Sequence, residues 1–326
     1  MGEFELIERF FTRPARHAAL GVGDDCALLM PSAGMQMAIS TDMLVESRHF
    51  LQGADPRLLG HKALAVNLSD LAACGARPLA FTLALALPRA DEDWLAAFSA
   101  GLFALADRHQ CDLIGGDTTA GPLAICITVF GEVPAGRALL RSGARAGDDV
   151  YVSGTLGDAR LALDALTGRR ALGSAALATA RARLEQPTPR VALGLALRGV
   201  ASAAIDVSDG LVGDLGHILA ASGVGACIDT SVAIDLLAIC EDSAFAAATI
   251  DAQIRLDCVL AGGDDYELAF CAAPTARAAV GAAAAQAGTR VTRIGRIEAA
   301  PGLRLVDGQG RAVAAPRLRP FDHFAR

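Results

Sequence analysis

The chain has 326 residues, 53% of them hydrophobic, and a formal net charge of −7. This length exceeds a typical single hydrophobic core and suits two domains, while the acidic balance argues against a nucleic-acid-binding protein, which needs a basic face. No apolar run approaches the roughly 20 residues that cross a bilayer, and the three Glu residues of the opening MGEFELIERF argue against a secretory signal, so we expect a cytoplasmic protein with no membrane partner.

The first half of the chain alternates segments with helical and strand patterns. The clearest helix begins with Asp55 as its N-cap and Pro56 at the first helical position, and it ends before Gly75. Asp91 is expected to cap a second long helix, DEDWLAAFSAGLFALADRH. The other elements predicted in this half are a helix over residues 2–11 and strands over residues 26–30, 36–41, 79–87, 113–117 and 123–133.

A segment rich in Gly and Arg, residues 137–149, has no hydrophobic periodicity and is the expected domain boundary. It divides the chain into domains at 1–137 and 138–326. Both halves mix helices and strands, so the predicted fold class is α/β (or α+β), with two mixed α/β domains. The elements predicted in the second half are strands over 150–154, 202–206, 266–272, 290–298, 302–306 and 311–315, with helices between 155 and about 200 and over 211–222 and 275–286.

Eight Cys residues occur singly in apolar surroundings, with no CxxC spacing and no Cys paired with His. Disulfide frameworks and thiolate metal sites both need paired or regularly spaced Cys. The pattern favours buried, reduced thiols over a zinc site or a disulfide frame.

Acidic clusters recur along the chain, mostly where an apolar run meets glycine. A single Asp beside Gly is ordinary turn or cap chemistry. Surface turns normally mix Asn, Ser and Lys, but Lys62 is the only Lys in this chain. Six acidic clusters are therefore harder to explain as ordinary surface turns. The clusters are GVGDD (21–25), AISTD (38–42), NLSD (67–70), IGGD (114–117), AIDVSDG (204–210) and AGGDDYE (261–267).

If these clusters converge, their carboxylates repel one another unless cations compensate them. Oxygen ligands from Asp, Ser and Thr suit Mg²⁺, which keeps several waters and is shared with substrate phosphates. Neither a GxxxxGK[ST] motif nor a GxGxxG after a strand occurs in the chain. A phosphate site would therefore be built from metal ions and backbone amides.

Two of these clusters keep a structural alternative in the first half of the chain. Asn67 and Asp70 share one helix face, although Asp70 could be a solvated helix residue. Ser40-Thr41-Asp42 offers three oxygens where a strand is expected to end, although Asp42 could cap a turn.

A third cluster keeps the same ambiguity in the second half. Asp206 and Asp209 flank Ser208 just before a predicted helix, so Ser208 or Asp209 could be its N-cap. The same helix start would offer amides to a phosphate. Among the six His residues, His49 lies closest in sequence to an acidic cluster, and both a functional and a structural role remain open for it.

Taken together, these segments resemble the thiamine-monophosphate kinase family, within the superfamily of aminoimidazole ribonucleotide synthetase-type enzymes that use ATP. The resemblance runs from about residue 3 to 325 with the motifs in order. It rests on GVGDDCA, AISTDMLVESRHF, KALAVNLSDLAACGARP, LIGGDTT, ALLRSGARAGD, AIDVSDGL, GGDDYEL and the terminal FDHFA.

The resemblance implies transfer of the ATP γ-phosphoryl group to thiamine monophosphate, giving thiamine diphosphate and ADP. It also implies several Mg²⁺ ions, ATP as co-substrate, and a homodimer built through the sheet of an N-terminal domain that binds ATP and Mg²⁺, with the C-terminal domain completing the active site. The acceptor is a phosphate oxygen that is already ionised, so no general base is expected, and Mg²⁺ held by Asp42, Asp70, Asp117 and Asp206 would assist the transfer.

The family's functional residues fall on matching positions of this sequence. Gly115 and Gly116 would let the backbone approach the nucleotide phosphates. The implied Mg²⁺ ligands are Asp25, Ser40, Thr41, Asp42, Asp70, Asp117, Asp206 and Asp209; the implied ATP contacts are Gly116, Asp117, Arg141 and Ser208; and the implied contacts to thiamine phosphate are His49, Asp264 and Phe321.

Two positions depart from the family's usual pattern. Asp264 stands where the family commonly has Glu, which shortens the side chain by one methylene. Phe321 stands where Tyr is also seen, which keeps a ring for stacking and loses a hydroxyl.

Two alternatives remain for the function: another ATP-dependent synthetase of the superfamily, and a non-catalytic Mg-nucleotide-binding module. A selenophosphate synthetase would carry a reactive Cys in a Gly-rich N-terminal segment, whereas Cys26 follows GDD and begins an apolar strand.

Overall fold

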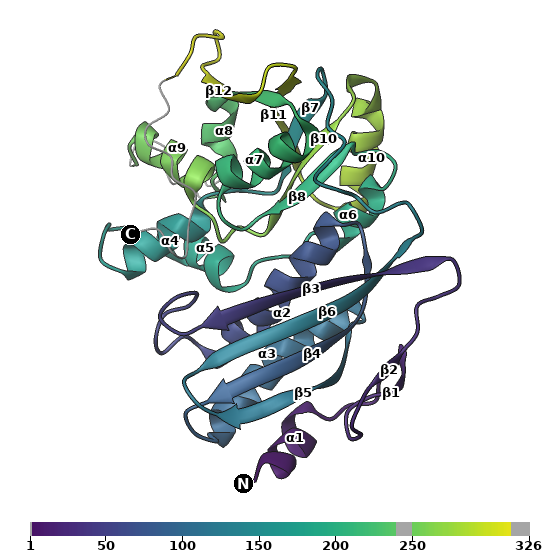
Figure 1. The fold of residues 1–326 in the computed structure, drawn as a ribbon. Helices are drawn as coiled ribbons and strands as arrows, with labels where there is room; N and C mark the ends of the chain where they lie inside the picture. Colours follow the sequence, from purple (N-terminus) through teal and green to yellow (C-terminus); the bar gives the residue numbers. More distant parts are fainter. Residues whose placement is uncertain (1, 239–249, 314–326) are drawn as a thin grey trace. The chain divides into compact units, whose positions relative to one another are not determined.

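The computed structural model describes residues 2–238 and 250–313. The chain forms two compact units, shown in Figure 1. The first consists of Met1–Leu71 and Ala76–Ala138, and the second of Ala72–Gly75 and Leu139–Arg326. Each unit mixes helices with its own sheet, which confirms the α/β class.

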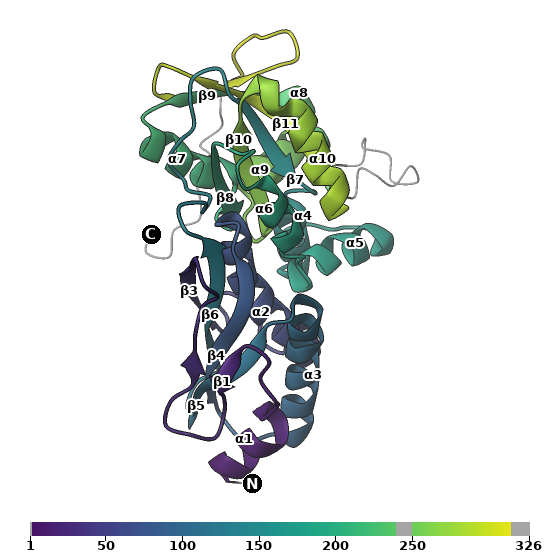
Figure 2. The ribbon, with the colours of Figure 1, turned by 90° about the vertical axis from the view of Figure 1, so that its right-hand side faces the viewer.

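The first unit is built on a four-stranded sheet with the order β3-β6-β4-β5. Strand β6 pairs antiparallel with β3 and β4, and β4 pairs parallel with β5. Two long helices, α2 and α3, cover one face of this sheet (Figure 2). The elements of this unit are α1 (Glu3–Phe11), β1 (Ala18–Leu20), β2 (Leu28–Leu29), β3 (Met35–Val45), α2 (Pro56–Ala73), β4 (Arg77–Leu87), α3 (Glu92–His109), β5 (Asp112–Ala120) and β6 (Ala124–Pro134).

Both predicted helix caps of this unit are confirmed. The Asp55 carboxylate accepts the amides of Arg57 at 2.8 Å and Leu58 at 3.2 Å, which satisfies two N–H groups at the start of α2. The Asp91 carboxylate accepts the amide of Trp94 at 3.1 Å at the start of α3. These caps fix where the two helices begin against the sheet.

The second unit contains a six-stranded sheet with the order β12-β9-β11-β7-β10-β8, in which only the β12–β9 pair is parallel. Buried aliphatic side chains from its strands and helices form one core. Its elements are β7 (Asp149–Ser153), α4 (Asp158–Leu166), α5 (Ser174–Glu185), α6 (Val191–Leu197), β8 (Ala203–Val207), α7 (Leu211–Ser222), β9 (Gly225–Asp229), α8 (Thr230–Ala233), η1 (Ile234–Leu236), α9 (Ala252–Ala261), β10 (Glu267–Ala272), η4 (Pro274–Ala276), α10 (Arg277–Ala287), β11 (Val291–Glu298) and β12 (Gly302–Val306).

The predicted ends of two strands were wrong. Strand β3 continues past the STD motif to Val45, and β5 continues past the GGD motif to Ala120. The neighbouring strands account for this, because Asp42 pairs with Ile127 of β6 and Asp117 pairs with Ala84 of β4. The acidic side chains of both motifs therefore project from within the sheet and not from strand ends.

Other differences concern short segments. Strand β9 and helix α9 were not predicted, and the strand expected over 26–30 is only Leu28–Leu29. The strand expected over 311–315 is reduced to an isolated bridge between Val306 and Ala312, and residues from 314 on lie outside the described part. Within the described residues, every helix is too short or too polar to cross a membrane.

Candidate functional site

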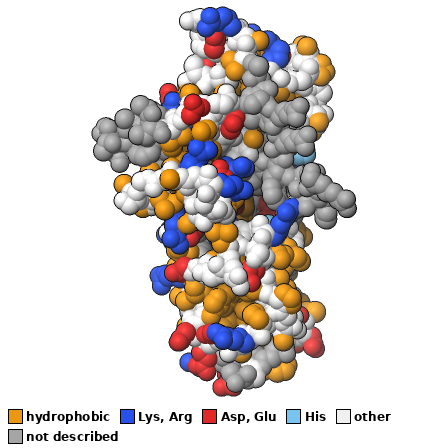
Figure 3. Space-filling model, turned by 90° about the vertical axis from the view of Figure 1, so that its left-hand side faces the viewer, with side chains coloured by type: hydrophobic (Ala, Val, Ile, Leu, Met, Phe, Trp, Pro, Cys, Tyr) orange, Lys and Arg blue, Asp and Glu red, His pale blue; other side chains and the backbone are white. Residues whose placement is uncertain are grey.

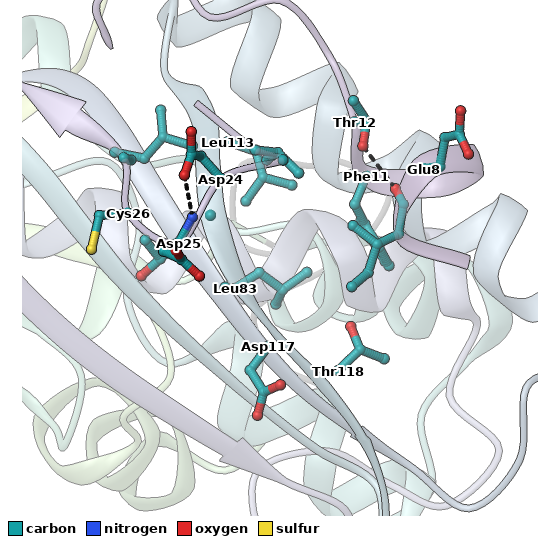
Figure 4. Close-up of a pocket in the computed structure, with 18 of the residues that line it drawn as sticks. Glu8, Phe11, Thr12, Asp24, Asp25, Cys26, Leu83, Leu113, Asp117 and Thr118 are labelled. Atoms are coloured by element: carbon teal, nitrogen blue, oxygen red, sulfur yellow. Dashed lines mark hydrogen bonds between the residues drawn. The ribbon is translucent and has the colours of Figure 1, made fainter. Parts of the chain in front are cut away.

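The first unit contains a pocket of about 890 Å³ beside its sheet. Helix α1, the segment 22–27 and strands β4 and β5 line it. Figure 4 shows Asp24 and Asp25 on the 22–27 segment, with Asp117 and Thr118 on another wall. Two of the sequence-predicted metal ligands, Asp25 and Asp117, and the predicted nucleotide contact Gly116 thus line one pocket.

The pocket pairs these carboxylates with an apolar wall. Phe11, Leu83 and Leu113 contribute side chains to the lining. Asp117 is exposed, and its carboxylate has no hydrogen bond or ion pair with any residue that the structure describes. Asp25 is also exposed, and its amide donates to the Asp24 carboxylate at 2.8 Å. Carboxylates gathered in this way attract a cation.

Gly116 lies where strand β4 comes too close to leave room for a side chain. It has φ of +149°, and a Cβ placed on it would lie 1.9 Å from the carbonyl oxygen of Leu83 on β4. Gly115 is different, because a Cβ there would meet only the Thr82 Cγ2 at 3.8 Å. The register between β4 and β5 shifts between Phe81 and Thr82, next to these glycines. Close strand contact accounts for the glycine at 116, a reason that the sequence did not reveal.

The motifs on β3 and α2 face each other. The Ser40 hydroxyl donates to the Asp70 carboxylate at 2.5 Å, and the Asp42 amide donates to the Asn67 side-chain oxygen at 3.1 Å. Asp70 is partly buried as well as hydrogen-bonded, so it is not a solvated helix residue. The predicted proximity of the STD and NLSD motifs is therefore present in the structure.

The Thr41 side chain does not join this group. Successive side chains of a strand point to opposite faces of the sheet, and the Thr41 hydroxyl shares a 2.8 Å hydrogen bond with the hydroxyl of Thr128 on β6. Thr41 is exposed, whereas Ser40 and Asp42 are partly buried. Of the three predicted ligands in this motif, two share a face and the third lies on the other.

His49 lies just after β3 in a tight turn. Its Nδ1 accepts the Val45 amide at 2.9 Å, and its own amide donates to the Val45 carbonyl at 2.9 Å. An Nδ1 that accepts a backbone N–H leaves the ring proton of a neutral imidazole on Nε2. The turn therefore presents His49 with Nε2 as a donor.

In the second unit, two loops bring Ser208, Asp209 and Asp264 together. The Asp264 amide donates to the Ser208 carbonyl at 2.7 Å, and the Tyr266 amide donates to the Val207 carbonyl at 2.8 Å. Asp206 lies at the end of β8 and is 6% exposed. The predicted DVSDG and GGDDYE motifs are thus neighbours.

The second of these loops has an unusual backbone. Asp264 and Tyr266 have positive φ angles of 65° and 53°, which few non-glycine residues adopt, although Asp does so more readily than most. Both carboxylate oxygens of Asp265 accept the Gly157 amide, at 2.9 and 3.0 Å. Burial raises the pKa of Asp265 well above its usual range. The sequence analysis assigned no role to Asp265, although it included the AGGDDYE cluster in which this residue lies.

Asp214, in the first turn of α7, was also missed. Its Oδ2 accepts the amides of Ser208, Asp209 and Gly210 at 3.0, 3.0 and 3.1 Å. Burial raises its pKa to about 6. The N-cap of α7 is Gly210, so the alternative in which Ser208 or Asp209 caps this helix is wrong. The amides of Ser208, Asp209 and Gly210, which precede the helix, donate to Asp214.

The two remaining predicted contacts are Arg141 and Phe321. Arg141 is exposed, and its carbonyl accepts the Ser222 hydroxyl at 3.3 Å, which ties its backbone to the end of α7. Phe321 lies outside the described residues.

The oxygen donors occur as pairs. Among residues 2–238 and 250–313, no three His, Cys, Asp or Glu side chains form a group that could hold a metal ion by themselves. Mg²⁺ does not need such a cage, because it commonly takes one or two carboxylates together with waters and substrate phosphates. The oxygen-only donors at Asp25 and Asp117, and at Ser40 and Asp70, fit Mg²⁺ in their chemistry.

The chain matches two family models, the N-terminal domain of AIR synthase related proteins over residues 23–133 and their C-terminal domain over residues 145–308. It is 47% identical to the thiamine-monophosphate kinase of Salmonella typhimurium, covering 99% of this chain and 98% of that protein.

Two solved structures are also similar. The crystal structure of the thiamine-monophosphate kinase of Stenotrophomonas maltophilia superposes with a TM-score of 0.82 at 46% identity, covering 95% of this chain and 96% of the other. A structure described as AaThiL complexed with AMPPCP and TMP superposes with a TM-score of 0.77 at 28% identity, covering 90% of this chain and 89% of the other. Full-length likeness in sequence and fold identifies the chain as a member of the thiamine-monophosphate kinase family.

Proposed function

We propose that this chain transfers the γ-phosphoryl group of ATP to thiamine monophosphate, giving thiamine diphosphate and ADP. The full-length likeness to thiamine-monophosphate kinases carries this proposal. A relative that binds AMPPCP, an analogue of ATP, together with TMP supports the pairing of the two substrates in one protein. The acidic pocket of the first unit supports a nucleotide bound through cations.

Mg²⁺ is the proposed cofactor, in several ions. When bound, it would neutralise negative charge on the phosphates as the phosphoryl group moves. The exposed carboxylates of Asp25 and Asp117, and the facing oxygens of Ser40 and Asp70, are the best supported ligands. The full proposed set is Asp25, Ser40, Thr41, Asp42, Asp70, Asp117, Asp206 and Asp209.

No general base is assigned. The acceptor is a phosphate oxygen, and the second pKa of a phosphate monoester is about 6, so that oxygen is largely ionised at neutral pH. The residues of the chain therefore need to align donor and acceptor and to exclude competing orientations. Alignment of this kind is worth up to about 7–11 kcal/mol in favourable cases.

The proposed nucleotide contacts are Gly116, Asp117, Arg141 and Ser208. Gly116 and Asp117 line the pocket, so the backbone of β5 and the Asp117 carboxylate both face the space where a nucleotide would bind. Arg141 is exposed and carries a guanidinium fork suited to phosphate oxygens.

The proposed contacts to thiamine phosphate are His49, Asp264 and Phe321. The Val45 amide donates to Nδ1 of His49, so a neutral imidazole carries its ring proton on Nε2, the nitrogen that would donate to a phosphate oxygen. The Asp264 amide donates to the Ser208 carbonyl, which holds the backbone that carries the shorter side chain.

We also propose a cytoplasmic homodimer, in which the N-terminal domain (1–137) dimerises through its sheet and the C-terminal domain (138–326) supplies the remaining ligands. Ile39 and Met43 are 61% and 56% exposed and alternate along β3 with the inward-facing Ser40 and Asp42. Figure 3 shows further hydrophobic side chains at the surface of the first unit. Sedimentation equilibrium tests this proposal, with a mass near twice 33.4 kDa expected and a monomer mass contradicting it.

The proposed activity is tested by incubating the purified protein with ATP, Mg²⁺ and either thiamine or thiamine monophosphate. Thiamine diphosphate is expected from the monophosphate only, and chelation of Mg²⁺ by EDTA should stop its formation. A non-catalytic nucleotide-binding module would bind ADP and form no product. Another synthetase of the superfamily would consume ATP only with a different acceptor.

A further inference from the structure

Asp214 is a buried carboxylate that the proposed chemistry does not use. It lies in the first turn of α7 and is only 4% exposed. A single oxygen, Oδ2, accepts three successive backbone amides, those of Ser208, Asp209 and Gly210. These residues form the turn that carries two of the proposed ligands.

The three hydrogen bonds fix the backbone of this turn from one side. Successive N–H groups can converge on one atom only within a narrow range of φ and ψ, so the directions of the Cα–Cβ bonds of Ser208 and Asp209 are fixed as well. On the other side, the Ser208 carbonyl accepts the Asp264 amide at 2.7 Å. Both polar groups of the Ser208 backbone are therefore engaged, and neither adjoining peptide can rotate without breaking a hydrogen bond.

Gly210 completes the turn. Its φ is +111°, and a Cβ at this position would lie 2.9 Å from backbone atoms of Ala261. The backbone of α9 therefore packs against the turn at Gly210, and the Asp214 carboxylate holds the turn through its three amides. The burial of a carboxylate is unfavourable unless hydrogen bonds compensate it, and here three amides do so.

We propose that Asp214 is a positioning residue of the kinase reaction: it holds the Ser208–Gly210 turn so that the Ser208 and Asp209 side chains are ordered for the magnesium nucleotide. The inference rests on the proposed function. Asp214 acts through the backbone of the turn and does not touch the substrate. Residues that orient metal ligands in this way typically contribute about 10- to 100-fold to metal affinity or activity.

Asp214→Ala and Asp214→Asn test this role against Asp149→Asn as a matched control. Asp149 is also a buried carboxylate, 3% exposed, and it pairs with Arg277 and Arg293 at the end of β7 opposite Ser153. Asp214→Ala removes all three acceptor bonds, and Asp214→Asn keeps a neutral acceptor oxygen. The readouts are the melting temperature, the Mg²⁺ concentration for half-maximal turnover, and the affinity for AMPPCP with and without Mg²⁺ by calorimetry.

We expect Asp214→Ala to raise the half-saturating Mg²⁺ concentration about 10-fold or more, with Asp214→Asn between it and the wild type. Affinity for AMPPCP should fall only when Mg²⁺ is present. The control should melt at a lower temperature with unchanged Mg²⁺ dependence.

A purely structural role for Asp214 would lower the melting temperature and leave the Mg²⁺ dependence at the wild-type value, and this result would overturn the proposal. If Asp214→Ala does not fold, the Mg²⁺ dependence of Asp214→Asn is compared with that of the wild type, and an unchanged value overturns the proposal in the same way. Product formation by the wild type tests the proposed function separately, so the two can fail independently.

Discussion

Replacement of Asp117 by Asn is expected to reduce turnover about 10²- to 10³-fold, the loss typical of one group that stabilises developing charge. Asp117 lines the pocket from β5 and is exposed. Its carboxylate makes no hydrogen bond or ion pair within the described part of the chain, so the fold loses nothing when its charge is removed. The melting temperature should therefore stay at the wild-type value while turnover falls.

Asp93→Asn is the matched control for this change, because Asp93 is an exposed carboxylate in the first turn of α3 and does not line the pocket. Steady-state kinetics with ATP and thiamine monophosphate at varied Mg²⁺ measure both variants. If Asp117→Asn kept the wild-type rate at limiting Mg²⁺, Asp117 would not be a metal ligand.

Gly116→Ala is expected to destabilise the first unit by about 3 kcal/mol or more, because a strained positive φ and an overpacked contact each cost about 1–3 kcal/mol. The new Cβ would lie 1.9 Å from the Leu83 carbonyl oxygen, well inside any real contact. Strands β4 and β5 would have to separate at the point where Gly116 pairs with Leu83. Because the pocket is built on these strands, nucleotide binding should weaken as well.

Gly115→Ala provides the comparison within the same motif. Its Cβ would meet only Thr82 Cγ2 at 3.8 Å, an ordinary contact, so its midpoint in urea should lie close to that of the wild type. Urea unfolding followed by circular dichroism measures both variants. Equal midpoints for the two alanine variants would show that the close approach of β4 does not constrain residue 116.

The elements that the sequence predicted best are those defined by local chemistry. Asp55 and Asp91 cap α2 and α3 as expected, since a cap depends only on residues two or three positions away. Strand ends were harder to predict because they depend on the partner strand. Strands β3 and β5 extend past their acidic motifs because β6 and β4 continue to pair with them.

The same distinction applies to the candidate site. The spacing of the motifs predicted which residue types would gather, and the Ser40–Asp70 contact agrees with it. The role of Asp265 depends on the amide of Gly157, which lies far away in the sequence. The role of Asp214 depends on the fold of the turn just before α7, which directs three nearby amides at one carboxylate oxygen. The outward direction of Thr41 follows from strand alternation once β3 is known to continue through the motif.

The most direct measurement of the central claim is a crystal structure of this protein with Mg²⁺, AMPPCP and thiamine monophosphate. We predict metal ions bound by the carboxylates of Asp25 and Asp117 that also contact the phosphates of AMPPCP. A structure with both substrates bound and these carboxylates turned toward bulk water, away from any metal ion, would contradict the account.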